Sequence, residues 1–390
     1  MPKNNIYLTF FIAIAIVFVL GKASLVAAQT LPEEGVINAP VTADLSDTYY
    51  RAKVLAIIET GEKEVEEGQV LKYQKLELEI LNGNEKGKHI TIDHGGSFVV
   101  SESQMVQVGE KVLLAKTPDL PGGREIYYII DKYRVNNLAF ITFVFFGLAI
   151  YFGRRRGLTS VIGLIFSILV IFYFIIPRII HGSNPFLVCI IGALVILFTS
   201  LYISHGFSRR TSVALLASVV SLALAIVINI IFVSIAKLSG SGAEEVFYLQ
   251  FSSAHIDLRG LLLGGIIIGV LGVLDDVTTS QTAAVEEISL ANSGLGFKEL
   301  YASGISIGRE HIASLINTLV LAYVGVSLPL LLLYSSQKTQ PFLMTINSAF
   351  IAEEIVRTLV GSAALVLAVP ITTGLAAWFC SRRKIAVNQK

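Results

Sequence analysis

Residues 213–235 read VALLASVVSLALAIVINIIFVSI, a run of 23 residues without an Asp, Glu, Lys or Arg. At a rise of about 1.5 Å per residue, a helix of this length can cross the ~30 Å hydrocarbon core of a bilayer. Such a helix is apolar on every side, which suits lipid and not water, because its backbone polar groups bond one another within the helix. The stretch therefore predicts a transmembrane helix.

Similar apolar segments make up most of the chain. They span residues 138–152, 158–176, 186–203, 261–285, 312–334 and 355–379. Overall, 54% of the residues are hydrophobic and only 15% are charged, whereas about a quarter of a soluble domain is charged. We predict an α-helical transmembrane bundle of about seven helices over residues 138–380, surrounded by the lipid bilayer and followed by a cytoplasmic tail at 381–390.

The distribution of basic residues predicts the orientation of this bundle. If the chain before residue 138 lies outside, the inner connections hold ten Lys and Arg and the outer connections hold four. The inner residues are Arg154, Arg155, Arg156, Arg209, Arg210, Lys298, Arg309, Arg382, Arg383 and Lys384. The outer residues are Arg178, Lys237, Arg259 and Lys338. Cytoplasmic connections are enriched in Lys and Arg, so we predict a multi-pass protein of the cell membrane with its N-terminal domain outside and its C-terminus in the cytoplasm.

Residues 1–28 have the pattern of a secretory signal. Lys3 precedes an apolar run at residues 6–20, and Val26 and Ala28 occupy the positions that a signal peptidase reads. We expect cleavage after Ala28. The alternative is an uncleaved signal anchor, which would add an eighth helix, and in either case the segment that follows is exported.

Residues 32–137 have the composition of a water-soluble domain. Strand patterns occur at residues 50–59, 74–81, 89–92, 111–116 and 126–130. The sequence KLELEI at 75–80 alternates polar and apolar residues, which is typical of a half-buried strand, and the Asn82-Gly83 pair after it is a turn signal. We predict a small all-β extracytoplasmic domain, either a barrel or a sandwich.

Few residues of this domain indicate further chemistry. His89, Asp93 and His94 form its one metal-like cluster, but their spacing is loose, and we interpret them as surface polar residues at a hairpin. We therefore predict no metal and no cofactor. Cys189 and Cys380 both belong to apolar runs, so no disulfide is expected in the exported domain. A net charge of +1 argues against a nucleic-acid partner.

The apolar segment 261–285 contains two residues that lipid disfavours, Asp275 and Asp276. Residues 261–274 are too few to cross a bilayer, so the helix must continue to residue 285. Asp276 then lies ten residues before Glu286, about 15 Å along the helix. An ionised carboxylate at that depth costs at least ~2.5 kcal/mol unless it is paired or hydrated.

One face of this helix carries small and polar residues. Its members, spaced three or four residues apart, are Gly265, Gly269, Gly272, Asp276 and Ser280. The two glycines of Gly265-x-x-x-Gly269 form a pattern for close helix packing in lipid. We therefore expect the face to abut another helix or a polar cavity and to take Asp276 with it, while Asp275 lies one residue round.

We interpret the two aspartates as a cation or proton site in an ion pathway. Asn317 and Thr318 lie about two turns into the segment 312–334, where we expect them to face the aspartates. Two alternatives stay open: a buried polar pair that is hydrogen-bonded for packing, and an acidic helix end at the cytoplasmic surface.

Charged residues also flank the last two segments. Glu354 precedes Arg357 by three residues, which is good ion-pair spacing on a helix. Arg309 marks the entry of the segment 312–334 and is interpreted as an interfacial charge. We expect structural roles for all three residues.

Six blocks of sequence, in order, resemble the YibE/F-like family of bacterial membrane proteins. They are DKYR (131–134), IDLRGLL (256–262), GVLGVLDD (269–276), GRE (308–310), NTLVLAY (317–323) and EEIVRTLVGS (353–362). The resemblance covers nearly the whole mature chain and implies a permease-like architecture, without a settled substrate or reaction. It also implies a single aspartate at the position of Asp276, with Asp275 as a variation.

These observations predict a transporter or permease for a small solute or ion, with its polar pathway at Asp276. The alternative is a non-transporting scaffold or sensor that binds a partner through the β domain. We predict that the protein is not an enzyme, because neighbouring aspartates on one helix cannot flank a scissile bond and no His-Glu-x-x-His motif occurs. A homo-oligomer or a membrane partner is left open.

Overall fold

The structure is a computed structural model that describes residues 48–65, 69–95, 100, 102–117, 126–242, 246, 248–249, 256–336 and 341–388. The predicted signal at residues 1–28 lies outside these residues and stays a prediction. Two compact units are present, one with the described residues up to Leu148 and one with those from Ala149 onward. Each is taken by itself.

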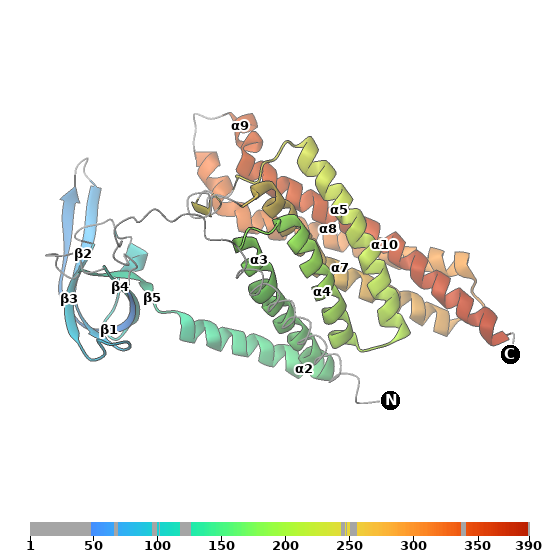
Figure 1. Ribbon diagram of the computed structural model, residues 1–390, viewed down its shortest axis with the longest axis horizontal. Coiled ribbons are helices and arrows are strands. Elements are labelled where there is room, and N and C mark those ends of the chain that lie inside the picture. Colours follow the sequence, from blue (N-terminus) through green and yellow to red (C-terminus); the bar gives the residue numbers. More distant parts are fainter. Residues whose placement is uncertain are drawn as a thin grey trace, which may run out of the picture. The chain divides into compact units, whose positions relative to one another are not determined.

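The first unit contains a five-stranded antiparallel sheet with the order β3-β2-β1-β4-β5. Its strands are β1 (Thr48–Val65), β2 (Gln69–Ile80), β3 (His89–His94), β4 (Lys111–Lys116) and β5 (Tyr127–Lys132). The edge strands β3 and β5 also contact one another, so the sheet curls into a half-barrel (Figure 1). The predicted all-β fold is confirmed, and each of the five predicted strands overlaps an observed strand.

The alternation in β2 produces the core of this half-barrel. Leu76, Leu78 and Ile80 are fully buried, and the charged residues between them point away from the core. The turn that follows needs Gly83, because its φ is +76° and a Cβ there would lie 2.9 Å from the Tyr50 ring. Local turn chemistry and strand period therefore agree.

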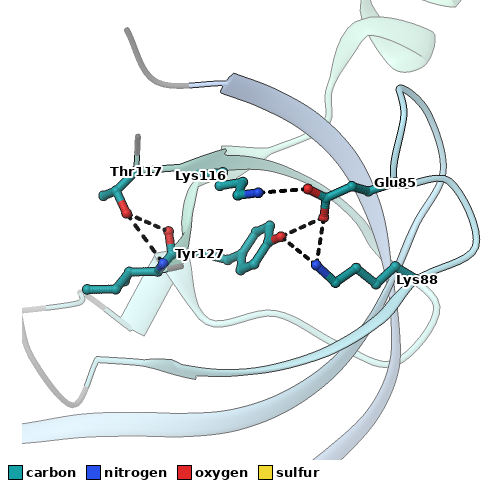
Figure 2. Close-up of polar contacts among 6 residues, drawn as sticks. Glu85, Lys88, Lys116, Thr117 and Tyr127 are labelled. Atoms are coloured by element: carbon teal, nitrogen blue, oxygen red, sulfur yellow. Dashed lines mark hydrogen bonds and ion pairs between the residues drawn. The ribbon is translucent and has the colours of Figure 1, made fainter. Parts of the chain in front are cut away.

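A polar cluster at Glu85 closes the half-barrel (Figure 2). The Glu85 carboxylate accepts hydrogen bonds from the Tyr127 hydroxyl at 2.5 Å, from Lys116 Nζ at 2.9 Å and from Lys88 Nζ at 3.0 Å. These bonds tie the loop between β2 and β3 to β4 and β5. The Tyr127 hydrogen bond and the two lysines lower the pKa of Glu85 from 4.5 to about 2.

The second unit is helical. Together with α2, which begins in the first unit, its helices are α2 (Val135–Val170), the π-helical turn η2 (Ile171–Ile175), α3 (Ile176–Ile180), α4 (Pro185–His205), α5 (Arg209–Ile235), α7 (Leu258–Ala291), α8 (Phe297–Ser336), α9 (Phe342–Asn347) and α10 (Ala349–Asn388). Within the described residues, six helical stretches are long and apolar enough to cross a membrane. Six of the seven predicted apolar segments lie inside these stretches. The remaining one, 312–334, lies inside α8 but extends past Pro329, where the candidate span ends. The predicted fold class is confirmed.

The difference between six and seven arises in α2. The stretch Val135–Ile180 is 46 residues long, about 69 Å if straight and more than twice the thickness of the hydrocarbon core. Arg154 interrupts it with φ 51° and ψ −130°. A Cβ built on Gly157 would lie 2.1 Å from the Ala149 carbonyl oxygen. In a straight helix these two residues, eight positions apart, would be separated by about 12 Å. The chain therefore turns back at Arg154, and the first two predicted segments are joined by one non-helical residue.

Helix α7 is central in the bundle. It contacts α4, α5, α8 and α10, and α10 contacts α5 and α8 in turn (Figure 1). Asp257 begins α7 as its N-cap and accepts a hydrogen bond from the Gly260 N–H at 3.0 Å. The first half of the IDLRGLL block thus has a structural role.

Candidate membrane-embedded carboxylate site

At Gly265 and Gly272, the glycine face of α7 meets none of the other described helices. Gly265, Gly272 and Asp276 are exposed, whereas the opposite Leu and Ile face is buried against the neighbouring helices. No described atom lies within 4 Å of a Cβ built on Gly265 or Gly272, and a Cβ built on Gly269 would lie 3.4 Å from the Tyr323 hydroxyl oxygen. The prediction of close packing is wrong at Gly265 and Gly272, because the larger apolar side chains of α7 make the helix contacts.

From Gly272 to Ser280 this face borders a groove instead, which was the second expectation. Two adjoining cavities form this groove. We call the one of about 360 Å³ the inner cavity and the one of about 820 Å³ the outer cavity; these names do not refer to the two sides of the membrane. Ser204, His205, Asp276 and Thr279 line both. The inner cavity lies between the second half of α2, α4 and α7, and the outer one continues to the N-terminus of α5.

Asp275 is the more enclosed of the two aspartates. Its Oδ2 accepts a hydrogen bond from Ser200 Oγ of α4 at 3.0 Å. Its Oδ1 is buried, and none of the described residues donates a hydrogen bond to it. We expected the glycine face to take Asp276 toward a helix or a polar cavity, and Asp276 does line the groove, where it is exposed. One residue step turns Asp275 toward α4.

Hydroxyl groups form much of the polar lining of the groove. Ser160, Ser167 and Ser200 line the inner cavity, and Ser280 lines the outer one. Ser280 Oγ donates to the Asp276 backbone carbonyl at 2.8 Å. Hydroxyls can both donate and accept hydrogen bonds, so this lining suits water or a hydrated ion.

Comparison with known families covers both units. The model of the YibE/F-like protein family matches residues 141–382, and that of the YibE/F family N-terminal domain matches residues 47–131. The chain belongs to the YibE/F-like family. This confirms the resemblance seen in the six blocks. Neither a curated protein nor a solved structure matches the chain.

Asn317 and Thr318, in the fifth of the six blocks that resemble the YibE/F-like family, do not face the aspartates. Both are exposed on α8 and line neither cavity, and Thr318 Oγ1 donates to the Ser314 carbonyl at 3.0 Å. The prediction is wrong because α8 meets α7 through a different face. There, Gln281 Nε2 donates to the Gly304 carbonyl at 2.7 Å.

Gln281 was missed by sequence reasoning. Besides Gly304, it donates to Thr373 Oγ1 of α10 at 2.8 Å, so one amide links three helices. The signal that could have found it is the pair Gly304 and Gly308, four residues apart on α8, where small residues let the α7 side chain approach.

The EEIVRTLVGS block of this YibE/F-like chain has a structural role at the other end of the bundle. Glu354 and Arg357 form an ion pair at 3.1 Å, and the buried Glu353 accepts a hydrogen bond from the Gly242 N–H at 3.0 Å. Glu353 therefore holds the connection between α5 and α7. Arg309 is exposed at the opposite end.

The histidines of the β domain do not form a cluster. Along β3, His89 and Asp93 point outward while His94 is buried, as the two-residue period of a strand requires. His89 Nδ1 lies 3.4 Å from a Glu77 carboxylate oxygen, and His94 Nε2 lies 3.3 Å from the Gln104 carbonyl. Among the described residues, no group of three or more His, Cys, Asp or Glu is placed to hold a metal ion.

Proposed function

We propose that this YibE/F-like protein is a transporter or permease that moves a proton or small cation along the groove of α7. The observation that carries the proposal is the state of Asp275. A buried carboxyl oxygen without a hydrogen-bond donor lies at the wall of a cavity, inside a helix that can span a membrane. Buried polar atoms are rarely left without a partner, so this oxygen suits a partner that binds and leaves, such as a proton or a small cation.

The length of the groove supports a pathway. Along α7 the inner cavity extends from Ile268 to Thr279 and the outer cavity from Asp276 to Glu286. The interval from Ile268 to Glu286 corresponds to about 27 Å of helix, close to the ~30 Å thickness of the hydrocarbon core. A groove confined to the helix end would not reach so far.

The two carboxylates have different parts in this proposal. Asp276 borders both cavities and is exposed, so it receives the ion from the outer cavity. Asp275 borders only the inner cavity and holds the ion between Ser200 and its unpartnered oxygen. Neighbouring carboxylates repel one another when both are ionised, and one bound proton or cation relieves that repulsion.

The test is ion flux in liposomes that contain the full-length protein. An enclosed pH dye reports proton entry under a potassium diffusion potential, and ion-selective dyes report Na⁺ and K⁺. We expect wild-type flux in at least one assay and an at least tenfold loss in Asp275→Asn. The matched control is Asp257→Asn on the same helix, where asparagine also serves as an N-cap, and it should retain flux within twofold.

Two results would overturn the proposal. One is wild-type flux equal to that of empty liposomes for all three ions. The other is an Asp275→Asn variant that is folded and as active as Asp257→Asn. Thermal unfolding of each variant in detergent, read from the fluorescence of the single tryptophan, Trp378, checks that the substitutions leave the bundle intact.

A further inference from the structure

The outer cavity has a strongly basic wall. Arg155 and Arg156 come from the turn in α2, Arg209 and Arg210 from the first turn of α5, and His205 from the end of α4. Residues from three separate parts of the chain thus surround one space of about 820 Å³. The preference for basic residues on one side of a membrane accounts for arginines at this end, but it does not require them to converge on a cavity.

Carboxylates neutralise this wall only in part. Arg210 lies 3.8 Å from Glu286 and 3.7 Å from Glu287. Across the described part of the chain, no carboxylate forms an ion pair with Arg155, Arg156 or Arg209. The cavity lining contains only two acidic residues, Asp276 and Glu286, and Glu286 already pairs with Arg210. Positive charge therefore remains for a ligand.

The chemistry of the wall favours a phosphate group. A guanidinium group donates two parallel hydrogen bonds to phosphate oxygens, and a tetrahedral phosphate can accept such pairs from several directions, whereas a planar carboxylate offers only two oxygens. Hydroxyls of Ser208 and Thr211 line the same cavity. The N-terminus of α5 adds a partial positive charge.

We propose that the outer cavity binds a phosphate group, carried either by the headgroup of an anionic phospholipid or by a soluble phosphate compound. Asp276 lines the same cavity, but binding is measured apart from ion flux and the test variants change only arginines of α2 and α5. The site can therefore be tested whether or not the protein transports.

The test uses the full-length protein in two arms. In the first, native mass spectrometry measures retention of phosphatidylglycerol against phosphatidylcholine. In the second, calorimetry measures binding of inorganic phosphate and pyrophosphate to the protein in phosphatidylcholine nanodiscs at constant ionic strength. The test variant is Arg155→Gln/Arg209→Gln. The control, Lys298→Gln/Arg309→Gln, removes the same charge from exposed residues that do not line the cavity.

We expect saturable binding in at least one arm, weakened about tenfold in the test variant and less than twofold in the control. The responding arm identifies whether the phosphate comes from lipid or from solution. Should the double variant fail to fold, Arg209→Lys keeps the charge but loses the guanidinium fork, and it should weaken binding about threefold. Absence of saturable binding to all of these probes, or equal weakening in test and control variants, overturns the proposal.

Discussion

Two carboxylates show how differently the two units use the same chemical group. Glu85 of the β domain accepts hydrogen bonds from three side chains and thereby closes the sheet. Asp275 of the bundle accepts a side-chain hydrogen bond from Ser200 and has a second oxygen, buried, that none of the described residues reaches. A fully bonded carboxylate stabilises a fold, whereas an incompletely bonded one has room for a ligand. The predictions below test this contrast.

The largest effect should separate the two units by function. Deleting residues 48–132 should leave ion flux within twofold, because each unit has its own apolar core, while Asp275→Asn should lower flux at least tenfold. The liposome assay measures both. The scaffold or sensor alternative predicts the reverse in cells: the deletion removes the phenotype of the protein, and Asp275→Asn is silent.

Ser200→Ala should have a smaller effect on the same carboxylate. It removes the hydrogen bond to Asp275 Oδ2 but keeps the charge, so we expect a three- to tenfold loss of flux, with the dependence on ion concentration shifted more than the maximum rate. Ser218→Ala is a suitable control. Ser218 of α5 forms a hydrogen bond with Thr278, which lies on α7 as Asp275 does, and Ser218 lines neither cavity. Equal losses in the two variants would contradict a direct role for Ser200.

Glu85 should make the β domain sensitive to acid. The pKa of Glu85 is about 2 in the folded state against 4.5 for the ordinary group, so the unfolded chain binds more protons between these values. The contribution of Glu85 to the free energy of unfolding is roughly 2–3 kcal/mol. It is present above pH 4.5 and is lost as the pH falls to about 2. Hydrogen–deuterium exchange of β1–β5 peptides in the full-length protein measures it. Glu85→Gln should be less stable at neutral pH and show a flatter acid profile.

His94 should have the smallest effect, at higher pH. Burial lowers the pKa of His94 below the ordinary 6.5, so as the pH falls His94 is protonated in the unfolded chain before it is protonated in the folded one. Stability is fully present above pH 6.5 and declines as the pH falls below that value. Exchange of β3 peptides should rise over this range in wild type and stay level in His94→Gln. A variant with the same slope as wild type would assign the effect to another group.

Sequence alone predicted the elements better than their orientation. Charge-free runs and the KLELEI alternation reflect burial averaged over a whole element, and they located the spanning helices and the strands. Helical period grouped Gly265, Gly272 and Asp276 correctly on one face, but period does not tell whether that face meets a helix or a cavity. The position of Asn317 was mispredicted for this reason, since it depends on how neighbouring helices are rotated.

The turn at Arg154 was predicted as a connection, but its shortness was not. Segments 138–152 and 158–176 were predicted as separate spans, and Gly153 and Gly157 flank the arginine triplet between them. The pattern does not tell that Arg154 alone leaves the helical conformation.

That turn also constrains how the chain can be altered. With a carbonyl oxygen 2.1 Å from the place of a side chain at residue 157, even alanine there would force the two halves of α2 apart. Arg155 and Arg156 stand within this hairpin and also line the outer cavity, so opening the hairpin would move the basic wall as well. Substitution of Gly157 should therefore be tolerated only together with other changes that restore the positions of these arginines in the basic wall.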